Sequence, residues 1–278
     1  MLSDTDLQEH EFAWTGADFT HVQKLIYQKA GISLHDGKKA MVYSRLSRRL
    51  RETGHKSFSA YLGWLESSGG AEWQEFINAL TTNLTSFFRE NHHFDVLRDY
   101  LHTESFDRGV CKIWCSAAST GEEPYSLAMT ATEMLGRDHF KLTASDIDSK
   151  VLATAKNGIY NFDALKTVPD GMAKKYFLRG KGSNSGLVRA KPELRDSIDF
   201  MIVNLIEDNW PFREAFDVVF CRNVMIYFDA ETQRKVLAKI HRVMKPGGLL
   251  FVGHAENFSD SRDLFHLRGK TVYSRVGG

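Results

Sequence analysis

The spacing of apolar residues divides the chain into two regions. In the first third, apolar residues recur at every third or fourth position, which is typical of amphipathic helices. In residues 38–52, for example, Val42, Leu46 and Leu50 form a single stripe. The pattern predicts helices over residues 19–30, 38–52, 57–67, 72–82 and 91–102. We therefore expect an N-terminal helical domain over residues 1–102.

After a polar segment at residues 103–109, short apolar runs alternate with helical patterns. Strands are predicted over residues 110–116, 140–145, 199–203, 216–221 and 249–252, with a hairpin over 265–275. Helices are predicted over residues 122–135, 150–156 and 230–244. This alternation favours an α/β fold in which helices cover both faces of a mostly parallel sheet. The second domain is expected to span residues 103–278.

The connection between the helix at 150–156 and the strand at 199–203 is longer than one crossover needs. Within it, two short β-like runs flank a turn rich in Gly and Ser, over residues 176–189. We predict a small inserted antiparallel β subdomain at about residues 160–198. A flexible excursion is the alternative.

Composition limits the class of protein. The 278 residues are 42% hydrophobic and 26% charged, as in a globular protein. No apolar run exceeds five residues, and the first twenty residues carry no Lys or Arg, so neither membrane insertion nor a signal peptide is expected.

Cys111 and Cys115 would lie on one strand about 13 Å apart, too far for a disulfide. We expect a cytoplasmic monomer and, without Cys/His clusters of zinc spacing, no metal.

Charge is unevenly distributed, although the net charge is only +1. Residues 21–56 hold nine Lys or Arg and two acids, whereas the first twenty residues hold five acids and no base. One face of the helical domain is therefore expected to meet an acidic partner.

The most informative stretch for chemistry is residues 114–129, where a strand leads through a loop of small residues into a helix. This layout places backbone N–H groups and a helix N-terminus at the carboxyl end of a strand, where open α/β sheets bind nucleotide-like ligands. Gly121 is the only glycine in the loop, so neither a GxGxxG nor a phosphate-binding fingerprint is present. A nucleoside without phosphates, such as S-adenosylmethionine, fits better; an ordinary βα turn is the alternative.

Polar residues also follow the other predicted strands. Asp146 follows the second strand, where an acid can accept ribose hydroxyls, although Asp146 or Asp148 could instead cap the next helix. Asn204 follows the third strand, and Asn223 and Tyr227 follow the fourth. Arg89 ends a Thr/Asn/Ser-rich segment and on its own would be interpreted as a surface residue.

Six motifs, taken together and in this order, resemble those of the CheR family of chemotaxis receptor methyltransferases. They occupy residues 81–90, 118–126, 144–148, 221–229, 245–248 and 253–258. The resemblance implies a class I S-adenosylmethionine-dependent methyltransferase domain (α/β, Rossmann-like), a small N-terminal helical domain and an inserted β subdomain. It implies methyl transfer from S-adenosylmethionine to receptor glutamates, giving methyl esters and S-adenosylhomocysteine.

The resemblance also implies site residues. Arg89 and Tyr227 would flank the transferred methyl group. Cofactor contacts are implied for Asn83, Thr85, Arg89, Glu123, Asp146, Asn204, Leu205, Arg222 and Asn223. Residues of the helical domain implied to face the acidic receptor helix are Arg45, Arg48, Arg49 and Arg51. The β subdomain, through Gly180 and Gly182, would dock a receptor's C-terminal tail.

Two other functions use the same fold. The first is a methyltransferase acting on nucleic acid or a small molecule; against it, residues 223–227 do not form the Asn/Asp-Pro-Pro-Tyr motif of amine methylation. The second is a non-catalytic adaptor that binds S-adenosylmethionine, which the presence of both Arg89 and Tyr227 disfavours. We expect no nucleic-acid partner.

Overall fold

The computed structural model describes residues 11–106, 109–169 and 171–277. The chain forms two compact units, Met1–Thr82 and Asn83–Gly278. Most of the acidic N-terminal stretch noted in the sequence, residues 1–10, lies outside the described residues.

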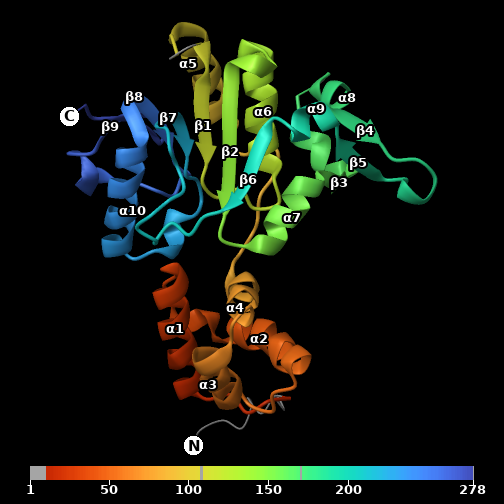
Figure 1. The fold of residues 1–278 in the computed structure, drawn as a ribbon, viewed down its shortest axis with the longest axis vertical. Helices are drawn as coiled ribbons and strands as arrows, with labels where there is room; N and C mark the ends of the chain where they lie inside the picture. Colours follow the sequence, from red (N-terminus) through yellow and green to blue (C-terminus); the bar gives the residue numbers. More distant parts are fainter. Residues whose placement is uncertain (1–10, 107–108, 170, 278) are drawn as a thin grey trace, which may run out of the picture. The chain divides into compact units, whose positions relative to one another are not determined.

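The first unit consists of helices, as predicted (Figure 1). They are α1 (Gly16–Ala30), α2 (Lys39–Thr53), α3 (Phe58–Ser68) and α4 (Glu72–Leu80). Helix α1 begins at a capping box, in which the Thr15 side chain and the Asp18 side chain each bond the other's backbone N–H. It ends at Gly31, which adopts the left-handed conformation that suits glycine. Side chains that repeat every three or four positions, among them Val22, Ile26 and Val42, are fully buried between the helices.

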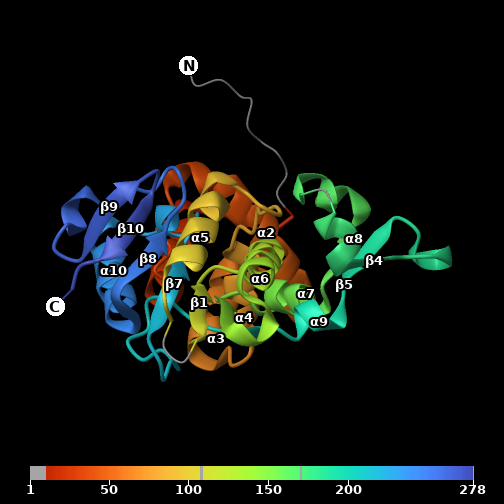
Figure 2. The same cartoon turned by 90° about the horizontal axis from the view of Figure 1, so that it is seen from above.

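The second unit is built around a seven-stranded sheet (Figures 1 and 2). Its order is β6-β2-β1-β7-β8-β10-β9. Strands β6, β2, β1, β7 and β8 are parallel, and β10 runs antiparallel between β8 and β9. The strands are β1 (Cys111–Cys115), β2 (Phe140–Asp146), β6 (Ile198–Ile202), β7 (Phe216–Phe220), β8 (Met244–Phe251), β9 (Phe265–Gly269) and β10 (Val272–Arg275). The prediction of a mostly parallel sheet is confirmed.

Alternating residues of the central strands enter two separate cores. Ile113, Val218 and Phe251 pack with side chains of α5 (His92–Thr103), α6 (Glu122–Leu135) and α7 (Ser149–Asn157). Trp114 and Val219, one position further along, pack with α10 (Ala230–Val243) on the other face. Burial on both faces explains why these strands are continuous apolar runs.

The inserted β subdomain is also confirmed, as a three-stranded antiparallel sheet of order β3-β5-β4. Its strands are β3 (Ile159–Asn161), β4 (Phe177–Arg179) and β5 (Leu187–Ala190), with the short helices α8 (Met172–Tyr176) and α9 (Pro192–Arg195). The sequence pattern missed β3.

The division between the two units differs from the predicted boundary at residue 102. Helix α5 belongs to the second unit, where Phe94, Leu97 and Leu101 are buried in the same core as α6. The spacing of apolar residues in α5 resembles that of α1–α4, so the sequence pattern assigned α5 to the N-terminal helical domain. Among the described residues, no helix is long and apolar enough to cross a membrane, and the three cysteines are unpaired and buried.

Candidate functional site

Four loops meet at one edge of the large sheet. Because β6, β2, β1 and β7 are adjacent and parallel, the segments that follow them lie side by side at their carboxyl ends. These segments begin at Val203, Ile147, Ser116 and Cys221, and Asp146 is the last residue of β2. Every strand-end residue predicted for the site is therefore at this edge.

The loop after β1 is tightly folded. Ser119 adopts a positive φ of 48°, and its N–H donates to Asp146 Oδ2 at 2.8 Å. Gly121 has a φ of 103°, and a Cβ there would lie 2.6 Å from the Tyr160 hydroxyl and 2.9 Å from Ala155 Cβ. A glycine is required here both for its backbone conformation and for the close approach of α7. Helix α6 begins immediately afterwards, at Glu122.

The structure assigns separate roles to Asp146, the last residue of β2, and Asp148, which follows the strand. Asp148 caps α7, accepting from the N–H groups of Lys150 and Val151. Asp146 accepts from Ser119 and, at 3.0 Å, from the N–H of Asp148. Burial raises the pKa of Asp146 to about 6, although these N–H donors oppose the rise. Asp146 is therefore the acid at the strand end, and the capping alternative applies to Asp148.

The segment from Asn83 to Arg89 is fastened to this edge at its start and its centre. The side-chain amide of Asn83 donates to Asp148 Oδ2 at 2.9 Å, and the backbone carbonyl of Asn83 accepts from the Ser119 hydroxyl at 3.0 Å. In the centre, Phe87 and Phe88 are buried, and the Phe88 N–H donates to Ser126 Oγ. Leu84 is 82% exposed and Thr85 is half-buried.

The other end of this segment is held by a buried arginine. Arg222 donates to the Arg89 carbonyl at 2.6 Å and to Glu123 Oε2 at 2.7 Å. Glu123 also accepts from Cys115 Sγ. Burial raises the pKa of Glu123, and Arg222 opposes this rise. Arg222 and Glu123, both predicted to contact the cofactor, thus bind each other, and Arg222 also binds the backbone of Arg89.

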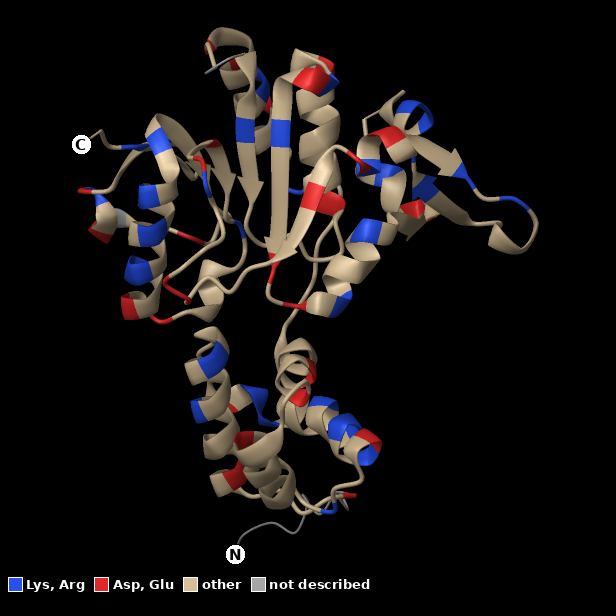
Figure 3. Ribbon diagram, viewed as in Figure 1, with Lys and Arg blue, Asp and Glu red and all other residues tan. Residues whose placement is uncertain are grey.

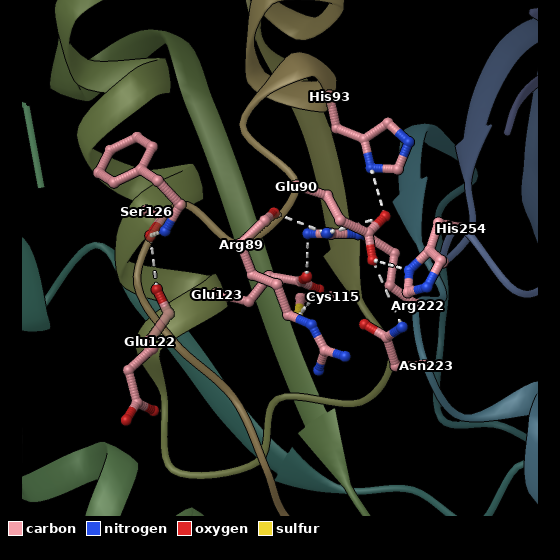
Figure 4. Close-up of polar contacts among 12 residues, drawn as sticks. Arg89, Glu90, His93, Cys115, Glu122, Glu123, Ser126, Arg222, Asn223 and His254 are labelled. Atoms are coloured by element: carbon pink, nitrogen blue, oxygen red, sulfur yellow. Dashed lines mark hydrogen bonds and ion pairs between the residues drawn. The ribbon is translucent and has the colours of Figure 1, made fainter. Parts of the chain in front are cut away.

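The Arg89 side chain lies apart from this ion pair (Figure 4). Its guanidinium points away from His93. Its Nη1 donates to the Leu84 carbonyl at 2.9 Å. Within the described part of the chain this is the one hydrogen bond of the side chain, so other N–H groups of Arg89 can bind a ligand.

Glu90 joins several elements of the site. Its carboxylate lies 3.3 Å from Arg222 Nη2 and 3.1 Å from His254 Nδ1. Burial alone would raise the pKa of Glu90, but Arg222 and His254 outweigh it and lower the pKa to about 2. Burial, assisted by Arg222, lowers the pKa of His93 to about 4. The side chains of Glu90, His92 and His93 lie close enough together to hold a metal ion. However, the Arg222 guanidinium paired with Glu90 would repel a cation there.

The remaining strand ends carry the other predicted residues. Asn204 Oδ1 accepts from the Ile206 N–H, and Leu205 is buried. Asn223 has a φ of 58°, and Tyr227 is half-buried in the turn Met225–Tyr227. Sequence reasoning missed Ser119, Glu90 and Glu256, although all three lie inside motifs that it identified.

Two of the four arginines predicted to face a partner make contacts within the helical unit. Arg49 is only 9% exposed and pairs with Glu72 at 2.6 Å, so it holds α2 against α4. Arg45 is half-buried and donates to the Thr81 carbonyl at 2.6 Å, just beyond the end of α4. Arg48 and Arg51 have side chains 76% and 56% exposed.

The two glycines predicted in the β subdomain shape the turn between β4 and β5. A Cβ at Gly180 would lie 2.0 Å from the Asn184 carbonyl oxygen, and Gly182 has a φ of 59°. The Gly180 N–H donates to the Leu187 carbonyl at 2.9 Å. Both positions therefore require glycine for local geometry, which holds the turn in one shape.

The donor set at the strand edge fits a nucleoside that carries no phosphate. A carboxylate offers about four acceptor positions, so Asp146 keeps capacity for ribose hydroxyls beside the two N–H bonds described. Residues 116–121 contain no Lys or Arg, the cations that hold phosphates. Arg89 supplies a cation for a carboxylate.

Comparison with known proteins agrees with both units. Residues 17–81 match the family described as "CheR methyltransferase, all-alpha domain", and residues 83–274 match "CheR methyltransferase, SAM binding domain". A chemotaxis protein methyltransferase of Escherichia coli (strain K12) is 49% identical over 94% of this chain and 92% of its own length. The corresponding protein of Salmonella typhimurium is 49% identical, over 94% and 91%. Chemotaxis protein methyltransferase 2 of Pseudomonas aeruginosa is 46% identical over 95% of both chains.

Proposed function

The chain belongs to the family of CheR methyltransferases, and we propose from this that it transfers a methyl group from S-adenosylmethionine to glutamate side chains of chemoreceptors. The products are a glutamate methyl ester and S-adenosylhomocysteine. The observation that carries the proposal is the double anchoring of residues 83–89 at the carboxyl edge of the sheet, through Asn83 and the Arg89 carbonyl. This fixes the backbone of Arg89 beside the nucleoside site.

The residues present would hold the cofactor as follows. Asp146 accepts the ribose hydroxyls, Asn204 and Leu205 border the base, and Asn83, Thr85 and Asn223 complete the site. Arg222 and Glu123 would border the cofactor, and Arg222, held by Glu123, also fixes the backbone of Arg89. S-adenosylmethionine supplies an electrophilic methyl group on a sulfonium.

Methylation of a glutamate needs little acid–base chemistry from the protein. A glutamate is ionised at neutral pH, since its ordinary pKa is about 4.3. The protein's contribution is therefore to position the carboxylate and to exclude water. Arg89 can orient a carboxylate by a charge-assisted hydrogen bond, and the ring of Tyr227 suits a neighbouring sulfonium cation.

The test is transfer of labelled methyl from S-adenosylmethionine to a receptor cytoplasmic fragment, followed by mild alkali. Release of the label as volatile methanol identifies a carboxyl methyl ester and supports the proposal. Label that resists alkali would indicate methylation of an amine or nucleic acid. Cofactor binding without any transfer would indicate an adaptor.

Cofactor affinity should depend on pH through Asp146. Its pKa of about 6 means that the carboxylate becomes neutral as the pH falls from about 7.5 to about 5.5, so affinity should fall roughly three- to tenfold, as charge-assisted bonds are lost. Calorimetry measures this. The pKa is raised in the folded state, so protonation of Asp146 stabilises the fold, and the loss cannot arise from unfolding through this group. A constant affinity over this range would contradict the role.

We further propose that the exposed cations of α2, Arg48 and Arg51, meet an acidic receptor helix. Figure 3 marks the Lys and Arg positions along α2 in blue. The variant Arg48→Glu/Arg51→Glu should raise the receptor KM about tenfold, because opposite charge steers association. Cofactor affinity should not change. Reversing the two exposed arginines Arg262 and Arg268 is the control. An unchanged KM at low ionic strength would exclude this surface.

The β subdomain is our proposed docking site for a receptor C-terminal tail. Strand β4 is an edge strand that carries the exposed Leu178 and Arg179, so a peptide can pair with it. Gly180→Ala should abolish binding of a tail peptide in calorimetry, because the added Cβ collides with the Asn184 carbonyl. Methylation of a receptor fragment without its tail should continue at the same rate. Full peptide affinity in this variant would place docking elsewhere.

A further inference from the structure

Glu256 is a buried acid outside the set of predicted site residues. It lies in the loop after β8 and is 4% exposed. Its Oε2 accepts from the N–H groups of Gly253 at 2.6 Å and Asn223 at 3.0 Å. Its Oε1 accepts from the N–H of Met225 at 2.8 Å and, more weakly, from Ile226 at 3.4 Å. One carboxylate therefore joins the loop after β8 to the loop after β7.

The loop that Glu256 holds is the one that carries Asn223 and Tyr227. Gln233 of α10 holds two carbonyls of this loop, because its side-chain amide donates to the Met225 carbonyl at 2.9 Å and to the Phe228 carbonyl at 3.1 Å. Met225 and Phe228 are buried anchors, whereas Asn223 and Tyr227 remain partly exposed. The loop's backbone is thus fixed by two distant side chains.

The approach of the two loops is very close. A Cβ at Gly253 would lie 2.4 Å from the Asn223 amide nitrogen and 3.0 Å from its backbone nitrogen. Asn223 also adopts a left-handed φ of 58°, a conformation that asparagine adopts more readily than most other residues with a side chain. The bond from the Asn223 N–H to Glu256 fixes the backbone at this residue.

The chemistry of these contacts requires an ionised carboxylate. All four partners of Glu256 are N–H donors, and a carboxylate has acceptors on both oxygens. In a glutamine, an NH₂ group would replace one of the two carboxylate oxygens. This group donates hydrogen bonds and could not accept from the backbone N–H groups that face it. Burial raises the pKa of Glu256, and the backbone N–H groups oppose this rise.

We propose that Glu256 is a positioning residue for methyl transfer: its carboxylate fixes the loop of residues 222–228 so that Asn223 and Tyr227 are presented to the cofactor and substrate. This rests on the proposed function only for the identity of the reaction. The positioning itself can be measured without turnover.

The experiment uses the full chain carrying Glu256→Gln, with the exposed Glu231→Gln as a matched control. Two readouts are taken: hydrogen exchange of residues 222–228, and kcat and KM with a receptor fragment. We expect exchange of these amides to rise at least tenfold and kcat to fall at least tenfold. The cofactor affinity should fall, because the loop carries Asn223, whereas the receptor KM should stay within about threefold; general loss of structure would impair both.

Unchanged protection of residues 222–228 would overturn the proposal, whether or not the wild-type protein methylates receptors. Increased exchange with wild-type kcat would also overturn it. Absence of methyl ester with the wild-type protein would instead reject the proposed function. If Glu256→Gln does not fold, Gly253→Ala decides, because its added methyl group disturbs the same contact between loops and should give the same pattern.

Discussion

Replacing Arg89 with alanine should lower kcat for methyl transfer by about 10²–10³-fold, the typical cost of removing a group that stabilises or orients reacting charge. Stability should change little. The Arg89 side chain makes one described hydrogen bond, to the Leu84 carbonyl, whereas the contact with Arg222 uses the backbone carbonyl and survives the substitution. Turnover at saturating substrates and the midpoint of thermal unfolding measure the two effects.

Arg98→Ala is the matched control for Arg89→Ala. Arg98 lies on α5 in the same unit and pairs with Asp95 at the surface, so its removal should leave kcat unchanged. Arg89→Lys should recover only part of the rate, because an ammonium lacks the planar pair of donors that fits a carboxylate. Near-normal turnover in Arg89→Ala would remove Arg89 from the reaction.

Sequence reasoning succeeded where one physical rule governed many residues. The central strands are apolar on both faces because helices cover both, and this pattern correctly predicted a parallel sheet. A second rule, that ligands bind at the carboxyl ends of parallel strands, placed Asp146, Asn204 and Asn223 at one edge of the sheet. These predictions needed periodicity and order along the chain, both of which a sequence contains.

Sequence reasoning failed where an outcome depended on contacts between distant residues. Arg49 looks like its neighbours Arg48 and Arg51, but only folding brings Glu72 to it and buries the pair. Likewise, Glu256 is one acid in a loop until four backbone N–H groups converge on it. The contacts of Arg222 with Glu123 and the Arg89 carbonyl also could not be foreseen, since these partners are far from it in sequence.

Arg222 should be the most important residue of the site for stability. Its side chain is only 1% exposed and neutralises two acids, Glu123 at 2.7 Å and Glu90 at 3.3 Å. Arg222→Met leaves both carboxylates buried without their cation and should lower the free energy of unfolding by about 3–5 kcal/mol. The Arg89 carbonyl also loses its donor, so methyl transfer should fall. Urea unfolding and single-turnover rates measure these effects.

Three comparisons test this explanation. Arg234→Met removes an arginine from the exposed pair with Asp263 and should leave the urea midpoint nearly unchanged. Adding Glu123→Gln to Arg222→Met should restore part of the lost stability, because one of the two unpaired charges disappears. The deficit of Arg222→Met should also shrink as the pH falls, since unpaired buried carboxylates take up protons and become neutral. If the deficit were constant with pH and unaffected by Glu123→Gln, lost packing around Arg222 would explain it better than unpaired charge.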